Sequence, residues 1–391
     1  MKIIILNHYQ RLAPRVELET RALHQAGHEL SVFNWRRDAG DAAQMPAPAA
    51  GFAVNWLDVP SPKASAGIVR ALPRLYREIA TQLAPQEFDV IHCTHFLLLP
   101  ASIRVAEKKG AQVVYDAYER YASDIAHQYF PGMRGQVCHL LEAAENRLVK
   151  RVDGVLTISS PGEILATRYM RNCGNVEVLY NVPAAGAAAV RSLREQYAGR
   201  NVMIYAGTMT RNTGIFRLAE TVALLRDEFP EVLLLMIGDF DSPGDEATFR
   251  DRVRLDGLER NIELIPWMPF ERLMEHASLA RIGIAPYQRH PRYLLLGKGT
   301  ARKIFTYMCA GLPVISSDFG EVARIVAEER CGILADTSSA AAVAAAARRL
   351  LRDGDAAAAM GAKGRAAVRE KYNWEQEQAK LLRLYERVAG R

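Results

Sequence analysis

Short apolar runs alternate with helical patterns along the first half of the chain. Lys2–Leu6 reads as a buried strand, a helix is expected from about Arg15 to Gln25, and HELSVFNW (28–35) supplies a second strand. The same rhythm returns in DVIHCTHFLLLPASIRVAEKKG (89–110) and in QVVYDAYERYASD (112–124). Strands that alternate with helices predict an α/β fold built on a parallel sheet.

A second set of alternating elements begins after an alanine-rich stretch. NVMIYAGTM (201–209), EVLLLMIGDF (231–240), NIELIPW (261–267) and RIGIAPY (281–287) read as strands, spaced by helices that start near Thr213, Asp245 and Phe270. Residues 184–190 are mostly alanine and read as a linker. We therefore expect two α/β domains, covering residues 1–183 and 191–372.

Composition limits the classes of protein to consider. The chain has 391 residues, of which 49% are hydrophobic and 24% charged, and its net charge is +6. These values are typical of globular proteins that handle anionic ligands, and no basic arm or nucleic-acid motif is present. The five scattered cysteines suit a reducing compartment and no cysteine metal site. No signal peptide or membrane span is expected, so we predict a cytoplasmic protein.

The stretch GKGTARKIFTYMCAGLPVISSDFG (297–320) carries the clearest chemistry. Thr300 is expected to cap a helix from about Ala301 to Ala310, followed by a short buried strand. Between Pro291 and Ser317 the sequence has no acid, but it has four cations, Arg292, Lys298, Arg302 and Lys303. Positive side chains near a helix N-terminus favour an anion, and a nucleotide diphosphate fits this requirement.

KIFTYMCAGLPVISSDFGE (303–321) resembles the donor-site segment of family 4 glycosyltransferases, whose pattern reads roughly K-[LI]-F-E-Y-M-A-A-G-[LK]-P-V-I. The resemblance implies a GT-B fold, in which two Rossmann-like domains face each other across a cleft, with residues 373–391 forming a helix that crosses back to the first domain. It also implies retaining transfer of a sugar from a nucleotide-diphosphate sugar. The family's Glu-x7-Glu motif is degenerate here, because Lys298 and Thr306 stand in place of the two glutamates.

Site residues follow from the resemblance. The second domain is expected to bind the donor, and the first domain the acceptor. The expected donor-binding residues are Gly207, Arg211, Lys298, Gly299, Arg302, Lys303, Thr306, Phe319, Gly320 and Glu321. The expected acceptor-binding residues are His8, Tyr9, Arg11, His95 and Tyr118. The segment from Asp116 to Glu119 resembles a family D-S-H-E segment, so both acids are catalytic candidates; the alternative is that they cap a helix.

No cofactor is expected beyond the nucleotide-sugar co-substrate, because no G-x-G-x-x-G occurs. No metal is expected either, since Asp239-Phe240-Asp241 follows a Rossmann-type strand and reads as a turn. A basic helical pattern from Ser65 to Leu83 suits either peripheral contact with anionic lipid at the inner face of the plasma membrane or ordinary packing with a solvated basic face.

The expected acceptor is a glycan or a lipid-linked precursor of the cell envelope or an exopolysaccharide. An alternative from another class is a catalytically silent relative that binds a nucleotide, a glycan or a partner enzyme. It is motivated by three departures from the family pattern, at Tyr118, Thr213 and Thr306. A third reading, a sugar-nucleotide 2-epimerase, needs several acid/base carboxylates, and the C-terminal half offers few.

Overall fold

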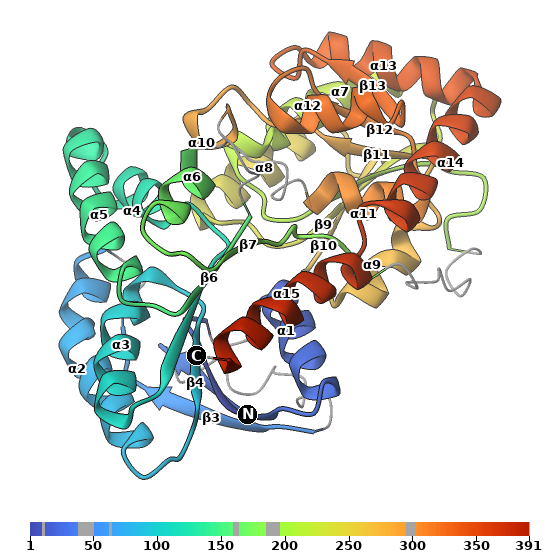
Figure 1. The fold of residues 1–391 in the computed structure, drawn as a ribbon. Helices are drawn as coiled ribbons and strands as arrows, with labels where there is room; N and C mark the ends of the chain where they lie inside the picture. Colours follow the sequence, from blue (N-terminus) through green and yellow to red (C-terminus); the bar gives the residue numbers. More distant parts are fainter. Residues whose placement is uncertain are drawn as a thin grey trace. The chain divides into compact units, whose positions relative to one another are not determined.

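Two parallel sheets organise the chain (Figure 1). The structure is a computed structural model, and it describes residues 1–9, 12–37, 51–61, 65–158, 164–184, 196–294 and 302–390. Unit 1 comprises residues 1–180 with 377–391, and unit 2 comprises residues 181–376. The predicted domain ends were residues 183 and 372. The predicted linker lies almost entirely outside the described residues.

Unit 1 is built on a seven-stranded sheet in the order β3-β2-β1-β4-β5-β6-β7, and every pairing is parallel. Its strands are β1 (Lys2–Asn7), β2 (Glu29–Arg36), β3 (Ala53–Asp58), β4 (Val90–Cys93), β5 (Gln112–Ala117), β6 (Gly154–Thr157) and β7 (Val176–Val178). Its helices are α1 (Pro14–Gln25), α2 (Ser65–Leu83), η2 (Phe96–Leu98), α3 (Leu99–Lys109), α4 (Tyr121–Tyr129), η3 (Pro131–Met133), α5 (Arg134–Val149), α6 (Ile164–Met170) and α15 (Trp374–Ala389).

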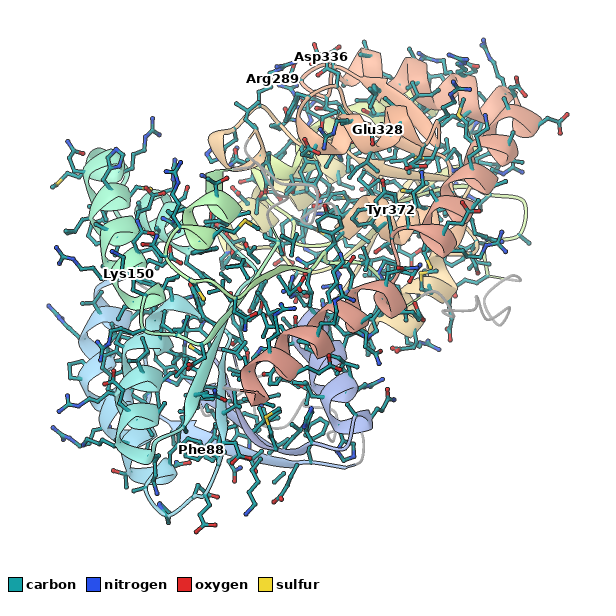
Figure 2. The ribbon with its side chains drawn as sticks, viewed as in Figure 1. Phe88, Lys150, Arg289, Glu328, Asp336 and Tyr372 are labelled. Atoms are coloured by element: carbon teal, nitrogen blue, oxygen red, sulfur yellow. The ribbon has the colours of Figure 1, made fainter. Side chains whose placement is uncertain are left out.

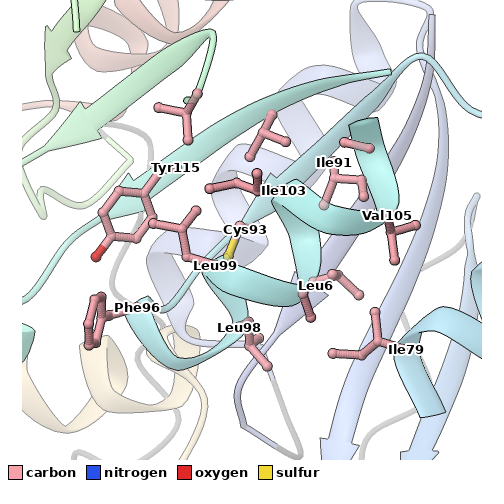
Figure 3. Close-up of a cluster of buried hydrophobic side chains, with 14 of the residues drawn as sticks. Leu6, Ile79, Ile91, Cys93, Phe96, Leu98, Leu99, Ile103, Val105 and Tyr115 are labelled. Carbon is pink, nitrogen blue, oxygen red and sulfur yellow. The ribbon is translucent and has the colours of Figure 1, made fainter. Parts of the chain in front are cut away.

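The strands of unit 1 are apolar almost throughout because both faces of a parallel sheet are covered. In β1 the residues from Ile3 to Leu6 are at most 3% exposed. Figure 3 shows one side of this core, where Leu6, Ile91 and Tyr115 of the sheet lie among side chains of α2 and α3. With both faces buried, alternation along a strand does not reveal which face a side chain takes.

Unit 2 is built on a six-stranded parallel sheet in the order β10-β9-β8-β11-β12-β13. Its strands are β8 (Asn201–Ala206), β9 (Val232–Ile237), β10 (Ile262–Ile265), β11 (Ile282–Ala285), β12 (Val314–Ser317) and β13 (Gly332–Ala335). Its helices are η4 (Arg211–Thr213), α7 (Ile215–Leu225), α8 (Pro243–Leu255), α9 (Phe270–Ala277), α10 (Pro291–Leu294), α11 (Arg302–Ala310), α12 (Gly320–Glu328), α13 (Ala340–Arg352) and α14 (Gly354–Glu370).

The last helix returns to unit 1, as the sequence predicted. Helix α15, red in Figure 1, belongs to unit 1 from Glu377 onward. There Gln112 of β5 donates from Nε2 to the carbonyl oxygen of Val388 at 2.8 Å, and Arg387 pairs with Glu177 of β7 at 2.7 Å. The predicted α/β fold with two Rossmann-like domains and a returning helix is thus confirmed.

Among the described residues, none of the helices combines the length and the apolar character that crossing a membrane would require.

Candidate functional site

The sheet of unit 2 has a topological switch point between β8 and β11. From β8 the chain adds β9 and β10 on one side, and then β11, β12 and β13 on the other. The loops that leave β8 and β11 therefore diverge at their carboxyl ends, at Ala206 and Ala285. Ligands of open α/β sheets bind in the crevice at such a point.

Tyr307 fixes helix α11 over this switch point. Its buried phenol accepts a hydrogen bond from the backbone N–H of Ala206 at 2.9 Å and donates one to the carbonyl oxygen of Ile284 at 3.2 Å. The ring lies so close to the sheet that a Cβ on Gly283 would come within 2.3 Å of it. Tyr307 therefore joins α11 to β8 and β11 at the same time. No prediction from the sequence assigned a role to this residue.

Lys303 lies one helical turn before Tyr307, on the same face of α11. Its Nζ lies 5.2 Å from the ring centroids of both Tyr205, near the end of β8, and Tyr287, just after β11. The neighbouring Gly207 has φ +129°, and a Cβ there would lie 2.8 Å from Cε of Lys303. Two aromatic faces and a glycine thus place one ammonium group at the carboxyl ends of β8 and β11.

Arg302 and Thr306 of α11 differ in whether a described residue of the protein provides a partner for the side chain. Arg302 has no ion pair with any described residue, and burial lowers the pKa of its guanidinium. A desolvated cation without a counter-ion is stabilised by an anionic ligand. The Thr306 side chain is buried, and its hydroxyl donates to the carbonyl oxygen of Arg302 at 2.9 Å. The ribose contact predicted for Thr306 would have to compete with this bond.

The turn before α12 extends the same edge of the sheet. Phe319 precedes this helix, Gly320 has φ +70°, and a Cβ on Gly320 would lie 3.4 Å from the carbonyl oxygen of Tyr293. The N–H groups at a helix start have no intrahelical partner and can face an anion. Arg289, labelled in Figure 2, lies 4.9 Å over the ring of Phe319 and pairs with Asp318 at 3.0 Å.

Two predicted donor residues have protein partners instead. Arg211 lies after β8, but its side chain is 61% exposed and its guanidinium pairs with Asp245 of α8 at 2.7 Å. Glu321 pairs with Arg324 one turn later in α12, also at 2.7 Å. Both roles stay predictions that require these ion pairs to open. Lys298 and Gly299 lie outside the described residues.

The sheet of unit 1 has its own switch point, between β1 and β4, and two histidines lie there. The rings of His8 and His95 stack with centroids 3.7 Å apart and an interplanar angle of 7°. Arg37, which follows β2, donates from Nη2 to the His8 ring and lies 4.2 Å over the ring of Trp35. The structure thus brings together two of the predicted acceptor residues, and adds Arg37 and Trp35, which the sequence analysis did not identify.

A hydrogen bond fixes the tautomer of His95. Nδ1 of His95 accepts the backbone N–H of Leu97 at 3.0 Å, so Nε2 carries the proton of the neutral ring. Burial lowers the pKa of both imidazoles well below 6.5; Arg37 adds to this for both rings, and His95 adds to it for His8. His95 at neutral pH is therefore a hydrogen-bond donor through Nε2, and it is not a base at Nδ1.

The other predicted unit 1 residues occupy varied environments. Tyr9 is 40% exposed beside His8, whereas Tyr118 is buried and its hydroxyl makes no hydrogen bond within the described part of the chain. Glu119 is half-buried between β5 and α4. Arg11 lies outside the described residues.

Asp116 does not face an open crevice. Its side chain is fully buried, and Oδ1 accepts a charged hydrogen bond from Arg15 of α1 at 2.7 Å. The strand-end position was expected, but the side chain points to the face of the sheet that α1 covers. A direct catalytic role stays a prediction that this geometry disfavours, and neither Asp116 nor Glu119 is bonded as the side-chain cap of α4.

Comparisons with known proteins place the chain among sugar-transferring enzymes. Residues 191–367 match the family described as glycosyl transferases group 1, and residues 12–181 match the glycosyl transferase 4-like domain. A phosphatidyl-myo-inositol mannosyltransferase of Mycolicibacterium smegmatis is 24% identical over 377 residues, which is 93% of this chain and 90% of that protein.

Solved structures show the same fold. The sucrose-phosphate synthase of Thermosynechococcus elongatus aligns with a TM-score of 0.77 at 19% identity, covering 100% of both chains. The Anabaena protein HepE, solved in complex with UDP-glucose, aligns with a TM-score of 0.73 at 15% identity, covering 99% of both chains.

Proposed function

The chain belongs to the GT-B glycosyltransferases of the family 4-like group and is a hexosyltransferase, and from that premise we propose that its donor is a nucleotide-diphosphate sugar. The sugar is transferred with retention of its anomeric configuration. The acceptor is a glycan or a lipid-linked precursor of the cell envelope or of an exopolysaccharide. In this proposal unit 2 binds the donor and unit 1 binds the acceptor.

The ammonium group of Lys303 carries the donor part of the proposal. It lies between Tyr205 and Tyr287, at the carboxyl ends of β8 and β11, which form the switch point of the sheet. Arg302, which pairs with no acid among the described residues and whose guanidinium pKa is lowered by burial, begins the same helix. A diphosphate is an anion whose oxygens can accept hydrogen bonds from these two cations and from the free N–H groups at the start of α12. HepE, of the same fold, was solved with UDP-glucose.

The site would contribute to the reaction by stabilising the negative charge that develops on the leaving phosphate oxygen. As the bond between the sugar and the diphosphate breaks, its electron pair moves to the leaving phosphate oxygen, and Lys303 and Arg302 stabilise that charge. The acceptor oxygen attacks from the same face, and its proton passes to the leaving diphosphate oxygen, so the configuration is retained. This step needs no carboxylate nucleophile, in keeping with the buried position of Asp116.

Unit 1 would orient the acceptor through the His8–His95 pair. His95 can donate from Nε2 to a hydroxyl or phosphate oxygen, while Arg37 provides positive charge beside it. The mannosyltransferase relative is named for a phosphoinositide lipid, which makes a lipid-linked acceptor a reasonable class to test. Peripheral contact with anionic lipid at the inner membrane face belongs to the same proposal. The apolar face of α2 is packed in the core, so this contact would depend on its exposed Arg70, Arg74 and Arg77.

The catalytically silent alternative keeps one supporting observation. Thr213 stands at a position where the family has a basic residue, and its hydroxyl is used to cap η4. A panel of sugar nucleotides that differ in base and sugar distinguishes the alternatives. An active enzyme releases the nucleoside diphosphate from one of them slowly without acceptor, and NMR shows the released sugar first in the donor's anomeric form. Absence of turnover across the panel, with or without nucleotide binding, supports the silent relative.

A further inference from the structure

A buried polar cluster in unit 1 joins α1, β4, β5 and α15. Arg15 donates from Nε to Oε1 of Glu19 at 2.8 Å and from Nη2 to Oδ1 of Asp116 at 2.7 Å. His92 of β4 shares a hydrogen bond between Nδ1 and the hydroxyl of Tyr385 at 2.8 Å. All five side chains are at most 5% exposed. Solvent therefore screens the charges of this cluster very little.

Three polar atoms in this cluster have no hydrogen-bond partner. Oε2 of Glu19, Oδ2 of Asp116 and Nε2 of His92 are fully buried and have no hydrogen-bond partner in the structure. Glu19, Asp116 and His92 each place one carboxylate oxygen or ring nitrogen within 4.8 Å of the others, and Oε2 of Glu19 is 3.4 Å from Nε2 of His92. Two carboxylate oxygens that approach each other in a dry interior repel strongly unless a positive charge lies between them.

Charge balance identifies what the cluster needs. With Glu19 and Asp116 both ionised, the two carboxylates and the guanidinium of Arg15 give a net charge of −1 in the interior. One proton brings the sum to zero. A divalent ion in the same place would leave a net charge of +1 beside Arg15. Glu377 and Lys380 of α15 lie next to the cluster, but they pair with each other at 2.8 Å and contribute no net charge.

We propose that Asp116 carries this proton at neutral pH and donates it from Oδ2 to Oε2 of Glu19. His92 then donates from Nε2 to the same oxygen, and Tyr385 donates its hydroxyl proton to Nδ1 of His92. Every buried polar atom of the cluster obtains a partner in this arrangement. Asp116 is accordingly a positioning residue, which links the end of β5 to α1 and, through Glu19 and His92, to the returning helix α15.

The direction of the pKa shifts agrees with the geometry. Burial raises the pKa of Asp116 well above its ordinary value; Arg15 opposes this, and the charge of Glu19 adds to it. Burial alone would raise the pKa of Glu19, but Arg15 and His92 outweigh it and lower that pKa. The other titratable groups that interact with Asp116 are Cys93, Tyr118, Tyr121 and Tyr385. Burial raises the pKa of all four, so all four are neutral at neutral pH. Of the two carboxyl groups, Asp116 is therefore the one that holds the proton.

Infrared spectroscopy of the full chain tests the proton directly. The difference spectrum of wild type minus Asp116→Asn at pH 7 should contain the C=O stretch of a protonated carboxyl group, sensitive to deuterium. Tyr385→Phe, which leaves both carboxyl groups in place, should keep this band, and Glu19→Gln should lose it. The proposal is overturned if wild type lacks the band, or if the purified protein contains a stoichiometric metal ion that Glu19→Gln lacks.

Stability measurements test the charge balance independently. The folded protein holds a proton that the unfolded chain releases near pH 4, so wild type loses stability as pH rises above that value. Relative to Asp116→Asn, its unfolding constant should rise tenfold per pH unit between pH 5 and pH 7. Each single amide variant leaves Arg15 hydrogen-bonded to one of these two carboxylates, whereas Glu19→Gln/Asp116→Asn removes both and should be far less stable. A pH-independent ratio, or a double variant as stable as the single variants, contradicts the proposal. Should Asp116→Asn fail to fold, the band is assigned by pH titration of wild type.

Discussion

The hydroxyl of Thr306 donates to the carbonyl oxygen of Arg302, 2.9 Å away and one turn earlier in α11. The family pattern has glutamate at this position, where a carboxylate would hold the ribose of the donor. In this chain the side chain is only 4% exposed, and its one donor is used within the helix. In the proposed function, donor binding would consequently depend more on the cations of α11 than on a ribose contact at Thr306.

Thr306→Val tests this interpretation of the degenerate motif. The substitution removes the hydroxyl at nearly constant volume, and we expect nucleoside diphosphate affinity to change by less than about 1 kcal/mol, because no ligand bond is lost. Calorimetric titration of wild type and variant measures the difference. A loss of affinity well beyond tenfold would show that the hydroxyl leaves Arg302 to bind the donor.

Gly207→Ala tests how closely the β8 loop approaches Lys303. A Cβ at Gly207 would lie 2.9 Å from Nζ of Lys303, and φ +129° is strained for alanine. We expect a stability cost of about 1–3 kcal/mol from backbone strain, together with weaker nucleotide binding, because the ammonium group is displaced.

Gly199→Ala is the matched control, since Gly199 has φ +77° and nothing lies within 4 Å of an added Cβ. It should lower the melting temperature without changing nucleotide affinity. Equal affinity losses in both variants would show that strain, and not contact with Lys303, is responsible.

The His8–His95 pair predicts a pH dependence of stability. The folded-state pKa of His8 is depressed, whereas the unfolded chain takes up its proton near pH 6.5. Stability contributed by His8 is therefore present above pH 6.5 and lost as pH falls below it. Urea unfolding at pH 8, 7, 6 and 5 should show wild type losing stability relative to His8→Phe by up to about 1.4 kcal/mol per pH unit below pH 6.5. A pH-independent difference would mean that His8 protonates freely in the folded protein.

Contact with lipid should be electrostatic if it occurs through α2. Arg70→Ser/Arg74→Ser should weaken flotation with vesicles that contain anionic lipid, and added salt should weaken wild-type binding as well. Arg250→Ser/Arg254→Ser on α8 of unit 2 makes the same change in net charge and should have little effect. Equal losses in the two variants would assign any binding to overall charge and not to α2.

Much of the fold could be predicted because strands buried on both faces are nearly continuous apolar runs. Lys303 was also predictable, since its motif fixes its place in the first turn of α11. The directions in which side chains point could not be predicted. Arg211 turns to Asp245, and Glu321 turns to Arg324, because each carboxylate or guanidinium takes the nearest opposite charge.

Tertiary partners also explain the positions of Asp116 and Tyr307. Asp116 was expected at a strand end, but in a strand buried on both faces the sequence does not show which face holds the charge. Its partner Arg15 lies 101 residues away in sequence. Tyr307 bonds to Ala206 of β8, also 101 residues away. Neither pairing has a local sequence signal.

In the proposed reaction, Lys303 binds the diphosphate of a sugar nucleotide. Calorimetric titration of the preferred nucleoside diphosphate into wild type, Lys303→Ala and the exposed control Lys363→Ala tests it directly. Loss of a charged hydrogen bond should weaken binding to Lys303→Ala by about 1–3 kcal/mol and leave Lys363→Ala unchanged. Affinity equal to wild type in Lys303→Ala would contradict the claim and remove this lysine from the donor site.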